Sequence, residues 1–363
     1  MRIALDAMGG DYAPEAIVQG GILAARRFDA HVILVGDRDQ LSRQLERVGV
    51  KGLPLSIHHA SQVVEMDESP SIAVRRKKDS SMRVALDLVR SGEASAAVSA
   101  GNSGAFMGMA MLALRPMMGV ERPAIGTLLP SPKGMRVALD VGANVECQPI
   151  HLVQFAVMGE VFAHYMLGIP RPRVGLLSNG EESSKGTELT RNAHEMLTKM
   201  SLNYIGYVEG RDIFMGDVDV IVTDGFTGNV VLKASEGIAK AITEMLRDEI
   251  SAGFFSRIGY LFARGAFKRL KARVDYREIG GAPLLGINGV GIICHGSSNA
   301  TAIASAIRVA MEMSEKRVNL KMMQLLEKNE DAHHWASKKE KRIWGQAKER
   351  IVQGVGGGEE EVY

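Results

Sequence analysis

Short runs of hydrophobic residues alternate along the chain with longer segments in which hydrophobic positions recur at helical spacing. The short runs predict strands at residues 3–5, 31–35, 55–58, 96–99, 125–129, 137–141, 173–177, 204–208, 218–223 and 289–294. The longer segments predict helices at residues 15–27, 82–90, 105–114, 150–166, 186–199, 229–250 and 299–315. Several strands are apolar at every position, which is typical of strands covered on both faces. The alternation predicts an α/β fold, with βα units in a mainly parallel sheet.

Two segments depart from this alternation. Residues 253–273 are basic and aromatic, and residues 321–363 are rich in charge and end in glycines and glutamates. We expect one α/β domain over residues 1–320, which includes the basic aromatic segment. Residues 321–363 are expected to form a charged, partly helical tail.

Composition excludes several classes of protein. A net charge of +2 is too small to indicate nucleic acid as the main partner. Two cysteines do not make a disulfide framework, which fits a reducing cytoplasm. The first residues form a strand-like stretch with no signal-peptide pattern, and no apolar run reaches ~18 residues, so we predict no transmembrane helix.

Polar, glycine-rich turns follow the predicted strands. In open parallel sheets, ligands bind beyond the carboxyl ends of the strands. The six turns are DAMGGD at 6–11, SAGNSG at 99–104, DVGAN at 140–144, NGEESSKGT at 179–187, DGFTGN at 224–229 and CHGSSN at 294–299; a seventh glycine-rich turn is expected at 280–283. Loop packing alone does not require lysine, asparagine and aspartate at successive strand ends, so the set indicates a ligand site.

Single turns leave alternatives open. The turn at 99–104 exposes backbone N–H groups at a helix start, which favour a phosphate or an oxyanion, and Asn102 and Ser103 add donors. A tight turn with a serine cap is the competing interpretation. Asp11 also suits a helix cap. Lys185 precedes its glycine, so its turn is not a Walker A loop, and a solvated capping loop fits there as well.

In order and spacing, the six motifs resemble the acyl-acyl-carrier-protein:phosphate acyltransferases of bacterial phospholipid synthesis, over roughly residues 1–315. The resemblance implies a three-layer α/β/α sandwich with a mainly parallel, mixed central sheet, similar to isocitrate and isopropylmalate dehydrogenases and to phosphotransacetylases. It implies a homodimer without cofactors that transfers a long-chain acyl group from acyl-acyl-carrier-protein to inorganic phosphate. The acyl phosphate would then serve glycerol 3-phosphate acylation, which makes the membrane glycerol-3-phosphate acyltransferase a further partner.

This reaction has modest chemical requirements. Phosphate is already anionic at neutral pH and a thiol of pKa ~8.5 is a tolerable leaving group, so direct attack requires neither a strong base nor an acyl-enzyme. Catalysis then depends on holding phosphate against the thioester and on stabilising the developing oxyanion. We expect Lys185, Asn229, Asp224 and His295 to be catalytic, and phosphate or substrate to contact Asp6, Gly9, Gly10, Asp11, Gly101, Asn102, Ser103, Gly104, Asn144, Asn179, Gly228 and Ser297.

Within this set some roles are narrower. Asp6 and Asp11 are expected to orient donors, because a carboxylate repels phosphate. His295 is a candidate proton donor to the departing thiolate, although a lone histidine is more often structural. Cys294 invites a thiol-nucleophile hypothesis, but adjacent strand residues point to opposite faces, so we predict a buried, inert thiol. The histidine pairs at 58–59 and 333–334 lack partner ligands, and no metal site is predicted.

The basic aromatic segment has three interpretations. On a helical wheel Phe255 and Phe262 lie on one face, and the opposite face carries Arg257, Arg264, Lys268 and Lys271. Such a helix suits an anionic bilayer, which would make a cytoplasmic protein peripherally membrane-associated. It equally suits an acidic carrier protein. The third interpretation is a dimer-packing helix with a solvated basic side.

Three other functions compete. An acyl-CoA-dependent phosphate acetyl- or butyryltransferase would share the chemistry and differ in its donor. A dehydrogenase on a related fold is less favoured, because no Gly-x-Gly-x-x-Gly follows a strand. A non-enzymatic phospho-ligand-binding protein is the third alternative.

Overall fold

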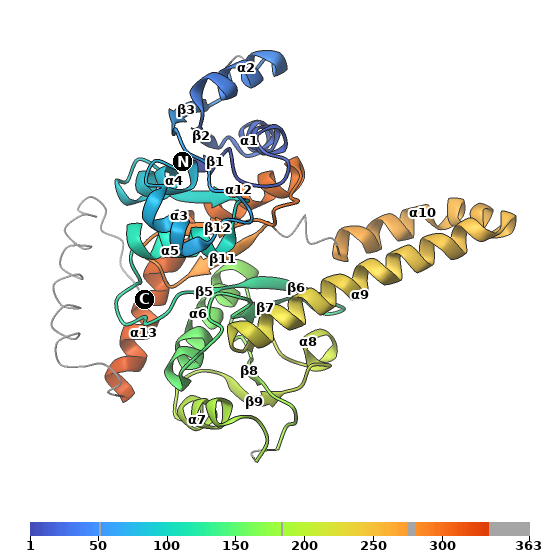
Figure 1. Cartoon of the computed structure of the whole chain (residues 1–363). Helices are drawn as coiled ribbons and strands as arrows, with labels where there is room; N and C mark the ends of the chain where they lie inside the picture. Colours follow the sequence, from blue (N-terminus) through green and yellow to red (C-terminus); the bar gives the residue numbers. More distant parts are fainter. Residues whose placement is uncertain (51, 183, 275–279, 334–363) are drawn as a thin grey trace.

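The computed structural model describes residues 1–50, 52–182, 184–274 and 280–333, without the side chains of residues 271–274 and 330–333. Within these ranges the apolar runs of the sequence form two sheets (Figure 1).

The first sheet has seven strands in the order β3-β2-β1-β4-β12-β11-β5. They are β1 (Arg2–Asp6), β2 (His31–Gly36), β3 (Leu55–His59), β4 (Ala96–Ser99), β5 (Ala124–Ile125), β11 (Ala282–Leu285) and β12 (Val290–Ile293). Strands β1, β2, β3, β4 and β12 are parallel, whereas β11 is antiparallel to both its neighbours. The turns after β1, β4 and β12 therefore meet at one edge of the sheet.

The second sheet has five strands in the order β6-β7-β10-β8-β9. They are β6 (Thr127–Ser131), β7 (Gly134–Leu139), β8 (Val174–Leu177), β9 (Tyr204–Val208) and β10 (Val220–Val222). All are parallel except β6, which is antiparallel to β7. Since Gly126 alone separates β5 from β6, the chain passes directly from one sheet into the other.

Helices cover both faces of each sheet. They are α1 (Glu15–Phe28), α2 (Arg38–Val48), α3 (Pro70–Arg76), α4 (Ser81–Arg90), α5 (Ser103–Ala113), α6 (Pro149–Leu167), α7 (Glu188–Leu197), α8 (Asp212–Met215), α9 (Gly225–Ala252) and α12 (Ala300–Glu315). Ile3 and Leu5 of β1 pack in one hydrophobic cluster with α1 and α12, and Ala4 packs in the other with α4 and α5. On the second sheet, α6 and α7 cover one face, and α8 and the first turns of α9 cover the other. The predicted three-layer α/β fold is confirmed, with its central sheet divided into two sections.

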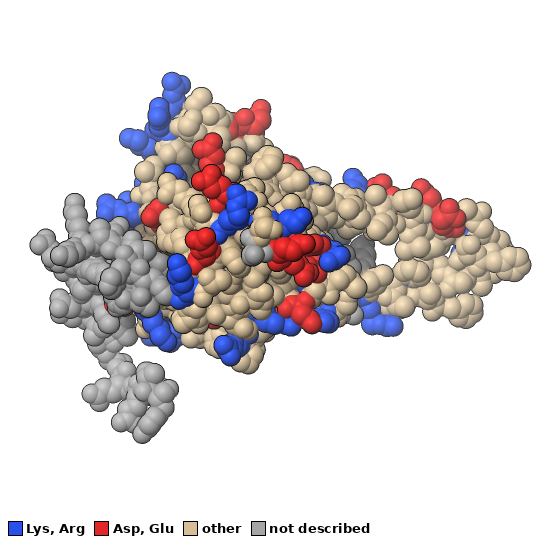
Figure 2. Space-filling view, turned by 90° about the horizontal axis from the view of Figure 1, so that it is seen from below, with Lys and Arg blue, Asp and Glu red and all other residues tan. Residues whose placement is uncertain are grey.

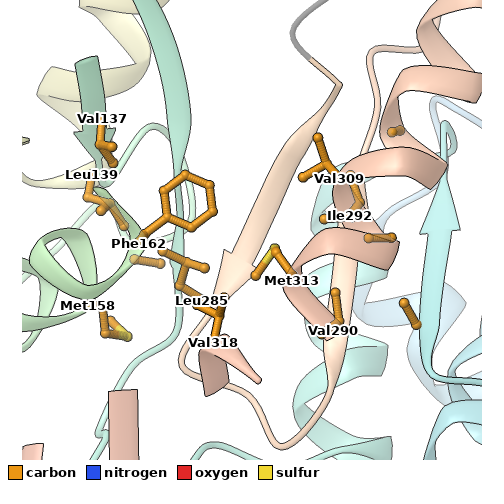
Figure 3. Packing of buried hydrophobic residues seen from close by; sticks show 14 of the residues in the cluster. Val137, Leu139, Met158, Phe162, Leu285, Val290, Ile292, Val309, Met313 and Val318 are labelled. Carbon is orange, nitrogen blue, oxygen red and sulfur yellow. The ribbon is translucent and has the colours of Figure 1, made fainter. Parts of the chain in front are cut away.

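One hydrophobic core connects the two sheets. In Figure 3, Phe162 of α6 lies beside Leu139 of β7 and faces Leu285 of β11, and Met313 of α12 lies on the far side of Leu285. All four side chains are buried. The two sheets therefore do not have separate cores.

A further helix, α13 (Val318–His333), continues this core. Its Val318, Met322 and Leu326 are buried. Burying a leucine or methionine side chain contributes about 1.5–3 kcal/mol, so the helix is firmly attached. The domain boundary expected at residue 320 falls inside α13, and the first residues of the expected tail pack in the fold. Residues 334–363 of that tail lie outside the described residues.

Helix α6 alone among the described helices is long and apolar enough to cross a membrane by length and composition. However, 67% of its most apolar window is buried inside the fold. It is the central helix against the second sheet, and its apolar surface is explained by that position.

Helix α9 and helix α10 (Phe254–Val274) form a hairpin that extends away from both sheets (Figure 1). Ile238, Ile242 and Met245 recur at helical spacing on α9 and are about 60–70% exposed. On α10, Phe255 is 85% and Phe262 is 89% exposed. The end of this hairpin is largely uncharged on the face seen in Figure 2.

Three expected elements differ in the structure. The strand expected at 125–129 is divided at Gly126 into β5 and β6, which belong to different sheets. Residues 280–283, expected as a turn, include the start of β11, and Ala282 and Pro283 pair with Ile293 and Ile292 of β12. The sharp turn lies at Gly280 and Gly281, whose φ angles are +102° and +76°. Helix α9 begins at Gly225, four residues before the expected start at Asn229.

Candidate active site

The turns after β1, β4 and β12 form one group, the first turn cluster (residues 6–11, 99–104 and 294–299). The backbone N–H of Asp11 donates to Gly296 O at 2.8 Å. A Cβ on Gly9 would lie 2.9 Å from the Gly101 nitrogen, and one on Gly10 would lie 3.1 Å from Ala100 Cβ. These turns therefore touch one another through their backbones, which requires small residues. Asp11 does not cap α1, since that helix starts after Pro14 without a side-chain cap.

Asp6 ties two turns of the first turn cluster together. Its buried carboxylate accepts a hydrogen bond from Ser99 Oγ at 2.6 Å and one from the Met8 N–H at 3.3 Å. Burial raises the pKa of the Asp6 carboxyl, and the hydrogen bonds from serine hydroxyls and backbone amides partly offset this. Asp6 is a positioning group within the fold rather than a surface ligand.

Asn102 caps α5 through a bond from the Ala105 N–H at 3.0 Å. Its amide donates to Met66 O and to Glu68 O, both at 3.0 Å. Both side-chain donors are thus used inside the protein, which leaves none for phosphate. The cap of this turn is Asn102 and not a serine. Ser103 is exposed at the first position of α5, with its hydroxyl and backbone N–H at the helix start.

His295 and Cys294 differ sharply in environment. His295 is exposed, and its Nδ1 accepts bonds from the Ser297 N–H at 3.1 Å and from Ser297 Oγ at 2.8 Å. The ring proton of the neutral form is therefore on Nε2. Cys294 is buried, and burial raises the pKa of its thiol to about 12. The thiolate needed for nucleophilic attack is scarce at neutral pH.

The turns after β7, β8 and β10 form the second turn cluster (residues 140–144, 178–187 and 224–229). Asp140 is its buried centre and accepts bonds from the N–H groups of Ile125, Gly142, Ala143 and Asn144. The Asn144 amide donates to Asp140 Oδ2 at 2.9 Å and to Pro123 O at 2.8 Å. Asn144 is buried with both donors used, so it braces the turn instead of facing a ligand.

The start of α9 packs closely on this turn. Asp224 caps the helix by accepting from Thr227 N–H and Thr227 Oγ1, both at 2.8 Å. A Cβ on Gly228 would lie 1.9 Å from Asp140 O, so only glycine fits there. Asn229 is exposed beside Gly142, and its side chain makes no hydrogen bond with any residue that the structure describes. Of the residues expected in this turn, Asn229 is the one whose polar group remains available to a ligand.

The 178–187 turn presents Lys185. Asn179 Oδ1 accepts from the Gly186 N–H at 2.9 Å, and the Lys185 N–H donates to Glu182 O at 2.9 Å, so the turn is held from inside. Ser183 of the motif lies outside the described residues. Lys185 is exposed and forms no ion pair within the described part of the chain, which leaves its ammonium group free for an anion.

A small apolar pocket lies beneath the first turns of α9. It is lined by Leu129, Ala138, Val141, Leu177, Ile213, Ile221, Thr223, Gly228, Val231 and Leu232. Gly228 belongs both to this pocket and to the second turn cluster. The pocket therefore adjoins the turn that presents Asn229.

The first turn cluster is internally connected, as are the turns at 140–144 and 224–229 of the second. Among the described residues, no hydrogen bond or ion pair joins the 178–187 turn to those two turns or joins one cluster to the other. Ser103, Lys185 and Asn229 are all exposed at strand ends, and their convergence on one ligand stays a prediction. In the basic aromatic segment, Arg264 and Lys268 lie on the exposed α10, Arg257 donates to Ser251 O, and the side chain of Lys271 lies outside the described residues. Among the described residues, no three His, Cys, Asp or Glu side chains gather as they would around a metal ion.

Sequence comparison places the chain in a family. A family model described as fatty acid synthesis protein matches residues 1–321. The chain is 57% identical over 327 residues to the phosphate acyltransferase of Geobacter sulfurreducens. This match covers 90% of this chain and 94% of that protein. It is 59% identical over 317 residues to that of Syntrophotalea carbinolica, covering 87% and 91%. The chain belongs to the phosphate acyltransferase family. It is accordingly an acyltransferase, and the hypothesis of a non-enzymatic binding protein is wrong.

Solved structures share the fold of this phosphate acyltransferase family member at low identity. The EutD phosphotransacetylase of Staphylococcus aureus superposes with a TM-score of 0.56 at 16% identity, over 86% of this chain and 94% of that one. A branched-chain phosphotransacylase of Enterococcus faecalis gives 0.53 at 13% identity, over 86% and 99%. A 4-hydroxythreonine-4-phosphate dehydrogenase of Klebsiella pneumoniae gives 0.50 at 14% identity, over 86% and 98%. The fold is thus shared by transacylases and dehydrogenases, as expected from the resemblance.

Proposed function

We propose that this acyltransferase moves a long-chain fatty acyl group from acyl-acyl-carrier-protein to inorganic phosphate. The product, an acyl phosphate, would be consumed by acylation of glycerol 3-phosphate in phospholipid synthesis. The observation that carries the proposal is the pair of turn clusters at strand ends in a chain with 57% identity to a named phosphate acyltransferase.

In the proposed reaction a phosphate oxygen attacks the thioester carbonyl carbon directly. The tetrahedral intermediate collapses with cleavage of the C–S bond, and the carrier thiolate leaves and takes up a proton. Both cysteines are poor nucleophiles, since burial raises the pKa of Cys294 to about 12 and that of Cys147 to about 11. This supports direct attack over an acyl-cysteine intermediate.

The two turn clusters are proposed to have different roles in binding the phosphate and stabilising the oxyanion. Ser103, with the backbone N–H groups at the start of α5, suits the phosphate, because a helix start favours anions. Lys185 offsets the repulsion between the phosphate and the developing oxyanion, and Asn229 donates to that oxyanion. His295 carries its proton on Nε2 and lies in the first turn cluster, where this N–H can donate a hydrogen bond to the departing thiolate. The thiolate takes up the proton that the attacking hydrogen phosphate loses, because a neutral imidazole N–H is too weak an acid to supply it.

The apolar pocket beside Asn229 is small, about 10 Å³, and would have to open to admit the first carbons of an acyl chain. Its lining is aliphatic except for Thr223 and Gly228, so it favours methylene groups over water. A thioester carbonyl near Asn229 would then place its chain toward Val231 and Leu232.

The test uses acyl-acyl-carrier-protein, acyl-CoA and ³²P-labelled phosphate with the purified full chain. The proposal predicts equimolar labelled acyl phosphate and free carrier thiol, with far lower turnover from acyl-CoA. Efficient turnover from acyl-CoA alone would favour the alternative donor, for which the shared fold of phosphotransacetylases is the supporting observation. Absence of labelled acyl phosphate with either donor would refute phosphate as the acceptor.

The projecting hairpin has two proposed contacts. The exposed apolar face of α9 at Ile238, Ile242 and Met245 suits the same face of a second copy, which supports a homodimer. The aromatic tip at Phe254 and Phe255, with basic residues on α10, suits an anionic bilayer. A cytoplasmic enzyme held at the membrane in this way would release acyl phosphate beside the membrane glycerol-3-phosphate acyltransferase.

A further inference from the structure

Residues 61–80, which we call the 61–80 loop, form a long excursion between β3 and α4 that includes α3. Its two ends are fastened together: Asp79 Oδ2 accepts from the Ser61 N–H at 2.9 Å and from Ser61 Oγ at 2.6 Å. The Gln62 N–H donates to Asp79 O at 3.1 Å, and the Ser81 N–H donates to Gln62 O at 3.0 Å. Loops with closed bases and packed interiors are compact units and are frequently functional.

The inner side of the 61–80 loop lies on the first turn cluster. Both amide donors of Asn102 hold its backbone, at Met66 O and Glu68 O. A Cβ on Gly296 would lie 2.7 Å from the Met66 methyl carbon, and one on Gly104 would lie 2.8 Å from Pro70 Cγ. The loop therefore forms the rim of the cluster that contains Ser103 and His295.

The loop carries four acidic and four basic residues, and the basic ones are consecutive at the end of α3, whereas the exposed Glu65 and Asp67 flank Met66. Arg75, Arg76 and Lys78 are exposed, and none of them forms an ion pair with any residue in the described ranges. Lys77 differs, because it bonds to Glu68 and to Val63 O within the loop, both at 2.5 Å. Ile72, on the same short helix, is 47% exposed.

Cations in the last turn of a helix have an ordinary structural explanation, since they offset the negative end of the helix dipole. The same arrangement occurs at Arg26 and Arg27 in the last turn of α1. What distinguishes Arg75 and Arg76 is their position: they continue into Lys78 and lie on the loop that borders the first turn cluster.

We infer that the 61–80 loop is the docking surface for the acidic carrier protein that delivers the thioester. The inference rests on the proposed function. Unpaired cations on a rim attract an acidic partner and orient it during encounter. A carrier held there has its thioester arm beside the first turn cluster. The exposed aromatic residues that suit a bilayer lie on the hairpin, which extends away from the part of the molecule that carries α3 (Figure 1).

The test compares Arg75→Glu/Arg76→Glu with the control Arg26→Glu/Arg27→Glu, each in the full chain. Both variants reverse two exposed arginines in the last turn of a helix, so they have the same charge change and similar effects on stability. Turnover is measured with acyl-acyl-carrier-protein and with acyl-pantetheine, which lacks the protein. Binding of the carrier protein is measured separately by calorimetry, and melting temperatures report folding.

The inference predicts that kcat/KM for the carrier-linked donor falls at least about tenfold in Arg75→Glu/Arg76→Glu at low ionic strength, with carrier binding weakened to match. The difference should shrink in high salt. Turnover with acyl-pantetheine and all properties of the control should be unchanged. Unaltered carrier binding in Arg75→Glu/Arg76→Glu would overturn the inference. Equal losses of kcat/KM with the carrier-linked donor and with acyl-pantetheine would also overturn it. If the unmodified chain binds the carrier through these arginines but makes no acyl phosphate, the proposed function is refuted. The docking surface would still be supported.

Discussion

At the scale of single residues, most side chains in the two turn clusters hold the turns in shape, and few remain free for chemistry. Asp6, Asn102, Asp140 and Asn144 use their polar atoms on the protein itself. Lys185 and Asn229 are exposed without such partners among the described residues. Substitutions of the two kinds should therefore have different effects, on stability for the first and on turnover for the second.

Gly228→Ala should destabilise the fold, because its Cβ would lie 1.9 Å from Asp140 O and α9 would have to move. We expect a loss of about 1–3 kcal/mol in the free energy of unfolding, together with reduced activity. Gly237→Ala is the matched control on the same helix, where an added Cβ would meet nothing within 4 Å apart from its chain neighbours and the nearby backbone of the helix. It should instead stabilise by about 0.5–1 kcal/mol. Urea denaturation of both variants is the measurement, and equal stabilities would contradict the packing argument.

Lys185→Ala should lower kcat by about a hundredfold, since it removes one preorganised charge from the transition state. The melting temperature should change little, because the ammonium group is exposed. Lys185→Arg should recover part of the activity, and Lys199→Ala, another exposed lysine near the end of α7, should leave it unchanged. Near-normal phosphate-dependent turnover in Lys185→Ala would remove this lysine from the mechanism.

Cys294 should be unreactive in the folded protein. With a thiol pKa of about 12, roughly one molecule in 10,000 carries the thiolate at pH 8, and the side chain is buried. Iodoacetamide should fail to label Cys294 at pH 8, and labelling should increase as the pH approaches 12 or when urea unfolds the chain. Cys294→Ala should keep a kcat close to that of the unmodified protein. Mass spectrometry that found an acyl group on Cys294 during turnover would contradict direct attack by phosphate.

At the scale of elements, the sequence predicted most strands and helices of the core. The prediction was wrong where the local composition was typical of a turn or a tail but tertiary contacts formed a strand or a helix. Residues 280–283 have the composition of a turn, yet Ala282 and Pro283 begin β11, because their pairing with β12 is decided by tertiary contacts. The charge of residues 321–333 concealed the buried positions Met322 and Leu326 of α13. The glycines at 225 and 228 suggested a loop, but both lie in the first turn of α9. Their lack of a side chain lets the start of this helix pack against Asp140.

The prediction at this scale concerns the hairpin of α9 and α10 and its contact with a membrane. Phe255→Ser/Phe262→Ser should weaken binding to vesicles of anionic phospholipid, because both rings are more than four-fifths exposed and would enter the bilayer interface. Leu112→Ser is the control, a 58% exposed leucine on α5 and not on the hairpin. Sedimentation with vesicles is the measurement. Unchanged sedimentation of the double variant would contradict membrane contact and favour dimer packing for this face.

At the scale of the whole molecule, two sheets share one core and each presents a turn cluster at the carboxyl ends of its parallel strands. The sequence predicted these turns because their polar residues are unusual for strand ends, and their order identified the family. It did not predict which polar atoms would be used internally, since Asn102 and Asn144 bond to carbonyl groups that are distant in sequence. Nor did it indicate the 61–80 loop, although four consecutive cations at 75–78 were the available signal.

The central claim is that the two turn clusters hold phosphate and the thioester together. A crystal structure of the full chain with phosphate and a non-reactive thioether analogue of the acyl-carrier arm tests it most directly. The account predicts phosphate within about 3 Å of both the Ser103 N–H and Lys185 Nζ, with the carbonyl of the analogue facing Asn229. Phosphate bound away from both groups, or the two ligands seated in separate places on the molecule, would contradict the account.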